Sequence, residues 1–350
     1  MQLNFNEAVL TIVSGHFIGN KGNGQEIVTS DKPFSLPADA LKTVKDAFLS
    51  KFNLESDKYA FSHGAALTFN EVYNFCLETL AEESTFQKNA INIAKHLYEN
   101  TTHPKVKPGE LYVCYFTNCF ADGVFLDALG IFKTETKSSF LDLVANGKES
   151  SLKLLSGSDV SKFDKACLVL PTNAEKGFDV LLYDSNGNRG DEAQFWREGF
   201  LGVVPQATEY YHTNQFMGLA KEFITSQLPH EYDIEKTGQI DLLNKSVEYF
   251  RANDAFDKKR FAEDVFEDKR IIKAFKEFEN NYTEMNEIDV PDNFAISIQA
   301  VKKQARVFKS VLKLDKNFHV YIHGDKSLIE KGFDERTGKN FYKIYFDEEA

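Results

Sequence analysis

The chain has 350 residues, of which 42% are hydrophobic and 13% aromatic, a composition that excludes general disorder and is typical of a folded globular protein. Its formal net charge of −12 disfavours a protein that coats nucleic acid with its whole surface. No run approaches the roughly 18–20 apolar residues of a membrane helix, and the four cysteines lack the spacing of a zinc site. Without a secretory leader pattern at the N-terminus, the chain is expected to be cytoplasmic, reduced and free of membrane contact.

The first 200 residues predict an α+β domain in which a mixed sheet shares its core with helices. Apolar, β-prone stretches at 8–17 and 26–34 flank a glycine-rich turn and predict a hairpin. Thr68 and Glu71 have the spacing of a capping box and predict the start of a helix. Helical periodicity predicts two further helices, at about 37–52 and 86–98.

The strongest hairpin pattern lies in the middle of this domain. Residues 111–120 and 124–132 are almost continuously apolar, and Asp122-Gly123 between them is typical of a type I′ turn. Continuous apolar character over such lengths predicts strands that are buried on both faces. Two more strands are expected at 166–170 and 178–183.

A second domain, 201–350, is predicted to be helical at first and to end in a sheet. Apolar residues recur at helical spacing from about 210 to 280. Three segments then suggest a C-terminal three-stranded antiparallel sheet, at 307–314, 318–323 and 341–346. In the second of them Phe318, Val320 and Ile322 alternate with polar or aromatic residues, as expected for a strand with one buried face.

Basic residues gather in this last segment, although the chain as a whole is acidic. Cations interleaved with aromatic rings suit a surface that follows a nucleic-acid backbone or stacks on bases, while the simpler interpretation is the solvated face of a half-covered sheet. The candidate DNA-binding residues are Lys302, Lys303, Arg306, Lys309, Lys313, Lys316, His319, Tyr321 and Lys343.

At these residues the sequence resembles a known family. The stretches VFKSVLKLDKNFHVYIHGDKSLIEKGFDERTGKNFYKIYF, GELYVCYFTNCFADGVFLDALGIFKTETKSSFL and DEAQFWREGFLG resemble three blocks of the bacterial nucleoid-associated protein family of the NdpA type. The resemblance implies association with the bacterial chromosome, in the nucleoid of the cytoplasm, without a cofactor. None of the three blocks is a catalytic motif, so no enzymatic activity is expected.

Three functions remain open at this point. The first is a nucleoid-associated protein that binds DNA non-specifically or through partners, as a homodimer or small oligomer whose weak sites add up on one polymer. The second is an adaptor that binds other chromosome proteins, for which the acidic helical region would present carboxylates. The third is a divergent metal-dependent nuclease, with Asp127, Glu135 and Asp142 as the carboxylates to consider, although surface positions are the simpler interpretation of these residues.

Overall fold

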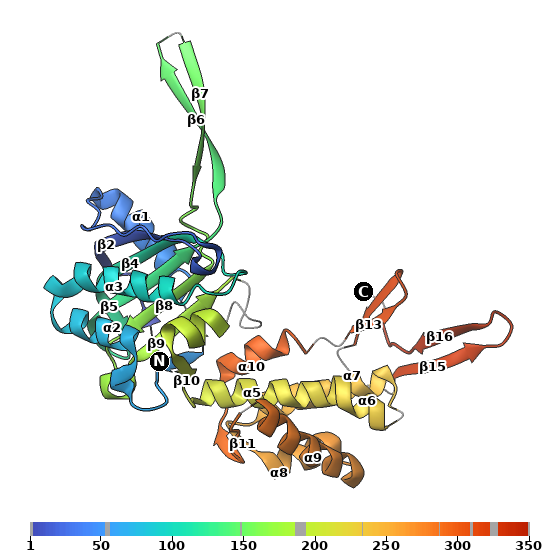
Figure 1. Ribbon diagram of the computed structural model, residues 1–350. Coiled ribbons are helices and arrows are strands. Elements are labelled where there is room, and N and C mark those ends of the chain that lie inside the picture. Colours follow the sequence, from blue (N-terminus) through green and yellow to red (C-terminus); the bar gives the residue numbers. More distant parts are fainter. Residues whose placement is uncertain are drawn as a thin grey trace. The chain divides into compact units, whose positions relative to one another are not determined.

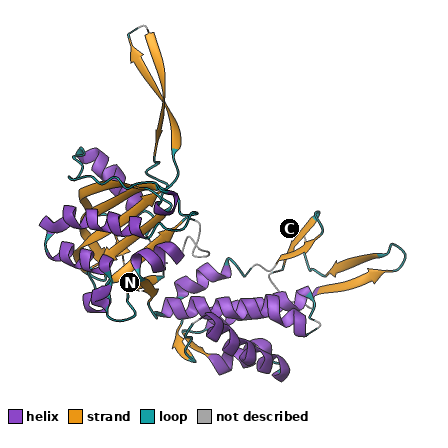
Figure 2. Ribbon diagram, viewed as in Figure 1, coloured by secondary structure: helices purple, strands orange, loops and turns teal. Residues whose placement is uncertain are grey.

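The computed structural model describes residues 3–52, 57–147, 149–185, 194–232, 234–286, 288–308, 311–322 and 328–348. The chain divides into two compact units, Met1–Gln206 and Ala207–Ala350. Each unit combines helices with antiparallel strands (Figures 1 and 2). The α+β fold class expected from the sequence is therefore confirmed.

An eight-stranded sheet forms the centre of the first unit, in the order β1-β4-β5-β8-β9-β3-β10, with β2 also paired to β4. These strands are β1 (Leu3–Asn4), β2 (Val9–Ile18), β3 (Lys58–Phe61), β4 (Gly109–Ala121), β5 (Val124–Thr134), β8 (Lys165–Leu170), β9 (Asp179–Asp184) and β10 (Val203–Pro205). All the ladders that join them are antiparallel. The expected mixed sheet is thus corrected to an antiparallel one. The short β4–β5 and β8–β9 connections allow no parallel pairing, and the ladders between strands more distant in sequence are antiparallel as well.

The central hairpin β4–β5 is confirmed, and both of its faces are covered. Asp122 and Gly123 have φ angles of 46° and 91°, the positive values that a type I′ turn requires. Alternate side chains of β4 enter two different apolar clusters, Leu111 and Val113 on one face and Phe116 on the other. Three helices cover these faces: α2 (Glu71–Ala81) and α3 (Phe86–Glu99) pack on the first, and α1 (Ala38–Leu49) on the second (Figure 1).

Two local expectations for the first unit are wrong. Residues 26–34 do not return as a strand, and only Val28 forms a bridge, to Phe17. Strand β2 pairs with β4 instead, which provides a longer ladder than a local hairpin would. Helix α2 is capped by Asn70 rather than by Thr68, because the Asn70 side chain accepts a hydrogen bond from the Tyr73 N–H at 2.9 Å while its amide donates to the carbonyls of Ser62, Leu201 and Gly202.

A long hairpin that the sequence analysis did not predict projects from the first unit. Its strands, β6 (Ser138–Asn146) and β7 (Glu149–Gly157), form a two-stranded sheet of their own. We call this hairpin the arm. Figure 1 shows that it extends away from the eight-stranded sheet of its unit.

The second unit has a helical core filled by phenylalanine. Its helices are α5 (Glu209–Glu222), α6 (Leu228–Glu231), α7 (Lys236–Ala252), α8 (Lys258–Phe266), α9 (Lys269–Asn286) and α10 (Ile298–Ala305), with a π-helical turn at Phe223–Gln227 and a short pair of strands, β11 (Ala255–Asp257) and β12 (Asn293–Ala295). The Phe216 ring lies 4.2 Å from that of Phe256 and 5.0 Å from that of Phe261, measured between ring centroids. Such tilted and edge-to-face contacts add to the apolar burial.

The chain ends in two separate hairpins instead of the expected three-stranded sheet. Strand β13 (Val311–Leu314) pairs with β14 (Phe318–Tyr321), and β15 (Ile329–Asp334) pairs with β16 (Lys339–Ile344). The antiparallel pairing is confirmed, but within the described chain no ladder joins the two hairpins. The sequence analysis did not predict strand β15. Because β16 pairs with β15 through the turn that joins them, β16 does not pair with β13 or β14 as expected.

Candidate nucleic-acid interface

The hairpin β13–β14 brings three of the candidate residues to one exposed face. Lys313 lies directly opposite His319, and Tyr321 lies opposite Val311 on the same face. All three candidate side chains are exposed. The other face contributes Leu312 and Ile322, which are buried against Ile240 of α7. One face of the hairpin is therefore held to its unit by apolar contacts, while the face with Lys313 is open to solvent.

Three further candidates lie at the end of α10. Ser297 caps the N-terminus of this helix, and its hydroxyl accepts a hydrogen bond from the Ala300 N–H. The helix packs on α5, and its Ala300 and Val301 are buried. Lys302, Lys303 and Arg306 follow on the exposed side. Cations at this end of a helix also balance its dipole, so part of this charge serves α10 itself.

Lys303 differs from its neighbours because it is held by a tyrosine. Its Nζ donates a hydrogen bond to the Tyr210 hydroxyl at 2.9 Å and lies 5.4 Å from the centre of the Tyr210 ring. The sequence analysis did not identify Tyr210, and no local pattern could have done so, because the two residues are 93 positions apart.

The hairpin β15–β16 carries Lys343, and two of its lysines have carboxylate partners. Arg336 and Lys339 of the same hairpin form no ion pair within the described chain. Lys343 lies opposite Glu330, with 3.9 Å between Nζ and the carboxylate, and 4.6 Å above the Tyr345 ring. Hydrogen bonding to Tyr345 and, to a smaller degree, the charge of Glu330 raise the pKa of Lys343. Lys331 similarly lies 3.5 Å from the carboxylate of Glu235. The structure therefore separates Lys343 from the sheet face on which it was expected.

The remaining candidate cations lie on α10 and around the hairpin β13–β14. Among the residues that the structure describes, four of them form no ion pair: Lys302, Arg306, Lys313 and Lys316. We call these four residues the unpaired cations. Lys316 lies in the turn between β13 and β14, beside Asp315. Lys309 lies outside the described residues.

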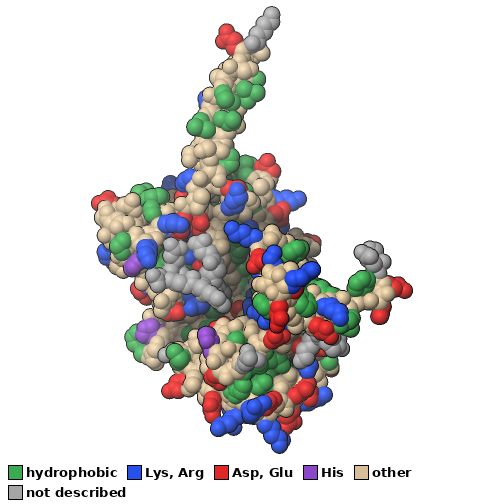
Figure 3. Space-filling model, turned by 90° about the vertical axis from the view of Figure 1, so that its right-hand side faces the viewer, with side chains coloured by type: hydrophobic (Ala, Val, Ile, Leu, Met, Phe, Trp, Pro, Cys, Tyr) green, Lys and Arg blue, Asp and Glu red, His purple; other side chains and the backbone are tan. Residues whose placement is uncertain are grey.

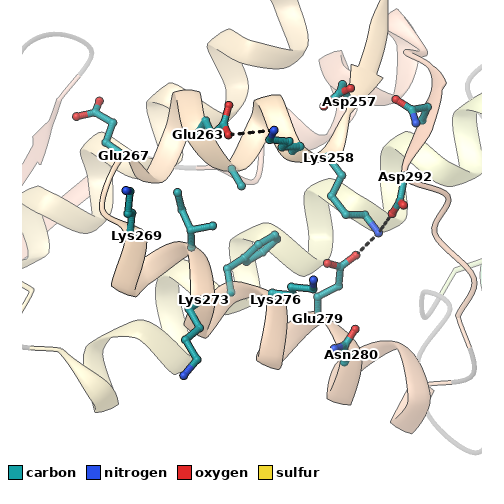
Figure 4. A pocket seen from close by; sticks show the side chains of 15 residues that line it. Asp257, Lys258, Glu263, Glu267, Lys269, Lys273, Lys276, Glu279, Asn280 and Asp292 are labelled. Atoms are coloured by element: carbon teal, nitrogen blue, oxygen red, sulfur yellow. Dashed lines mark ion pairs between the residues drawn. The ribbon is translucent and has the colours of Figure 1, made fainter.

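A pocket lies between α8 and α9, and the positive and negative side chains that line it are equal in number (Figure 4). It has a volume of about 1070 Å³, and its lining includes five lysines and five carboxylates. Lys258 Nζ lies 2.6 Å from both Glu279 and Asp292. Burial alone would lower the pKa of Lys258, but its bonds to these two carboxylates more than offset burial and raise the pKa. We interpret this pair of contacts as a structural clamp between α8, α9 and the segment before β12.

The carboxylates considered for a nuclease are not gathered into one site. Asp127 accepts a hydrogen bond from the Tyr115 hydroxyl at 3.0 Å. Glu135 is buried against Lys133, and Asp142 lies on the arm opposite Lys153. Within the described part of the chain, no group of three or more His, Cys, Asp or Glu side chains is arranged to hold a metal ion.

None of the described helices combines the length and apolar character needed to cross a membrane.

The features above define a two-unit α+β protein that ends in small hairpins, one of them with an exposed basic face. The chain matches the family model described as nucleoid-associated protein YejK over residues 15–348. It therefore belongs to this nucleoid-associated protein family, as the C-terminal and central blocks of the sequence suggested. No curated protein matches the chain in a sequence comparison.

Proposed function

We propose that this protein binds DNA in the bacterial nucleoid without sequence preference and without catalysis, through the unpaired cations. Family membership supports the nucleoid role. The observation that carries the DNA proposal is the difference between the two lysines of the first C-terminal hairpin and the two paired lysines of the second. Lys313 and Lys316 on the first lack ion-pair partners in the described chain, whereas Lys331 and Lys343 on the second are paired with Glu235 and Glu330.

Free cations are the ones that contribute most to polyanion binding. A lysine that neutralises a phosphate releases a condensed counterion, whereas a lysine already balanced by a carboxylate must first give up that partner. Contacts of this kind position a protein on the duplex without reading its sequence. The exposed His319 and Tyr321 beside Lys313 would add hydrogen bonding to the same backbone.

A salt titration with purified protein tests the proposal. Binding to several unrelated duplexes is measured at a series of salt concentrations, for the wild type and for Lys302→Ala/Arg306→Ala/Lys313→Ala/Lys316→Ala. We expect similar affinities for all duplexes and a variant with weaker binding. Its plot of log affinity against log salt should be flatter by about 0.9 for each phosphate that the variant no longer neutralises. A wild-type protein that fails to bind any duplex at low salt would contradict the proposal.

An adaptor is the second candidate function, and one groove of the second unit favours it. The groove lies along α9, has a volume of about 480 Å³ and is lined by Glu222, Glu231 and Glu277 together with apolar side chains. Met285 at this groove is 84% exposed. A groove that combines apolar side chains with three carboxylates suits a basic amphipathic helix from a partner protein.

The two candidates differ in what the isolated protein does. A DNA binder shifts DNA alone, whereas an adaptor needs its basic partner and loses that partner when Glu222, Glu231 and Glu277 are replaced by Gln. The nuclease alternative is tested in the same preparation by incubation with plasmid and Mg²⁺ or Mn²⁺. Loss of supercoiled plasmid would contradict the proposal of a protein without catalysis.

A further inference from the structure

The arm exposes an apolar face that no described residue of its own unit covers. Leu141 lies directly opposite Leu154, and Leu143 lies opposite Leu152. These four side chains share one face and are 68%, 72%, 67% and 62% exposed, in that order. We call them the leucine quartet. Figure 3 shows hydrophobic side chains along the projecting arm.

In the part of the chain that the structure describes, no other strand supports the arm, because β6 and β7 form ladders only with each other. A two-stranded hairpin by itself is at best marginally stable in water, and it gains stability when a further layer packs on it. Four leucines left more than 60% exposed therefore indicate that a second molecule provides this layer.

The charge of the arm indicates what kind of molecule this is. Residues 138–157 contain two acidic and two basic residues and so have no net charge, in a chain whose net charge is −12. A neutral leucine face has no attraction for DNA or for a strongly basic protein. A second copy of this acidic chain would meet the least charge repulsion here.

The geometry of the quartet also suits a second copy. A twofold interface needs a surface that complements itself, and leucine packed on leucine meets this condition without any matching of charges or hydrogen bonds. Each strand of the arm has nine residues, a length of about 30 Å at about 3.4 Å per residue. Two such hairpins can stack face to face at about 10 Å, as sheets do in a β-sandwich.

We propose that two copies of this protein associate through their arms, with the leucine quartets packed face to face about a twofold axis. The arm is narrow, so the interface falls at the small end of specific interfaces, which bury roughly 1,200–2,000 Å² in total. We therefore expect a reversible dimer in the micromolar range. This dimer does not depend on the proposed DNA binding, because it forms without DNA.

Analytical ultracentrifugation of the full chain, without DNA, tests this proposal. The wild type should change from a 39.8 kDa monomer to a dimer as its concentration rises through the micromolar range. In Leu141→Thr/Leu154→Thr the dimer should weaken by at least about tenfold. Threonine keeps the preference for strand structure while removing most of the apolar contact.

The matched control is Leu155→Thr, one residue further along the same strand. Leu155 lies opposite Phe140 on the other face of the arm, so its replacement should leave dimerisation unchanged. A wild type that stays monomeric, or a control that loses the dimer as completely as the quartet variant, overturns the proposal.

A second variant with a shortened arm tests the proposal even if the leucine substitutions prevent the arm from folding. Ser139 and Ser156 are paired directly, so residues 140–155 can be replaced by Asn-Gly, which forms a two-residue turn between paired strands. This protein should keep the helical circular dichroism and cooperative unfolding of the wild type and should remain monomeric. A dimer of unchanged strength in this protein would place the interface elsewhere and overturn the proposal.

Discussion

The sheet of the first unit and the C-terminal hairpins of the second use lysine in opposite ways. In the sheet, Lys133 and Lys165 lie opposite each other on β5 and β8, and both are almost fully buried. Each is neutralised by a buried carboxylate, Glu135 at 2.5 Å and Asp184 at 2.7 Å. On the hairpin β13–β14, in contrast, Lys313 is exposed and has no ion-pair partner in the described chain.

The difference shows that counting basic residues in a sequence does not locate a polyanion-binding surface. A buried lysine contributes to net charge but serves its own sheet, and an exposed lysine beside a carboxylate presents less net positive charge to a partner. Only exposed cations without such partners remain. Among the described residues of the C-terminal segment these are the unpaired cations, together with Arg336 and Lys339 on the last hairpin.

The largest effect should come from breaking a buried pair. Glu135→Gln leaves Lys133 buried without its counter-charge, and we expect it to lower the free energy of unfolding by about 3–5 kcal/mol. Burial already lowers the pKa of Lys133, with Glu135 opposing this shift. Urea unfolding monitored by circular dichroism measures the loss.

A double variant checks the cause of this loss. Lys133→Met/Glu135→Leu removes both charges, and a well-packed apolar pair is often as stable as the ion pair that it replaces. We expect it to recover most of the stability. A double variant that is as unstable as Glu135→Gln would show that the pair itself, rather than the uncompensated lysine, is what the fold requires.

A smaller effect should appear at alkaline pH, because the first unit also buries its thiols. Burial raises the pKa of Cys76 from 9.0 to about 12. A raised pKa in the folded state means that the unfolded chain loses this proton first, so stability is fully present below pH 9.0 and declines as the pH rises from 9.0 toward 12. One thiol contributes about 1.4 kcal/mol per pH unit in this window.

A cysteine variant isolates this contribution from those of other groups. Between pH 9 and 10.5 the stability of Cys76→Ala should fall by about 2 kcal/mol less than that of the wild type. The comparison uses the change with pH, so the constant cost of the cavity cancels. Equal slopes for the two proteins would contradict the assignment.

The smallest effect on stability should come from the exposed pair of the last hairpin. Glu330→Gln removes the partner of Lys343 at the surface, and we expect no measurable change in the free energy of unfolding. The same change frees Lys343 for phosphate, so the salt dependence of DNA binding should become steeper by up to about 0.9. A clear loss of stability would show that this exposed pair stabilises the fold as the buried pairs do, and would contradict the distinction between the two regions.

Much of the fold could be predicted where local patterns decide it. The Asp122-Gly123 turn and the alternation at Phe318, Val320 and Ile322 encode their hairpins within a few residues. The partner of β2 could not be predicted, because pairing with β4 depends on residues about a hundred positions away. The arm was not predicted, although its leucines alternate with other residues as in a strand, and only the structure shows that these leucines are exposed.

The candidate site was predicted in part. The basic segment was visible in the sequence, and the structure places Lys313, His319 and Tyr321 on one face as expected. Lys343 lies on another hairpin, opposite Glu330. Because strand β15 was not predicted, the sequence could not show that Lys343 faces Glu330. The ion pairs of the basic segment could therefore be assigned only from the structure.

The most direct test of the DNA proposal compares two double variants, each of which replaces two lysines and so changes the net charge by the same amount. Lys313→Ala/Lys316→Ala removes two unpaired cations, and Lys331→Ala/Lys343→Ala removes two that are held by carboxylates. The measurement is the slope of log affinity for duplex DNA against log salt. We expect the first variant to be flatter than the wild type by about 1.8, at about 0.9 per phosphate, and the second to change much less. Equal slopes in the two variants, or no change in the first, would contradict the claim that unpaired cations form the DNA surface.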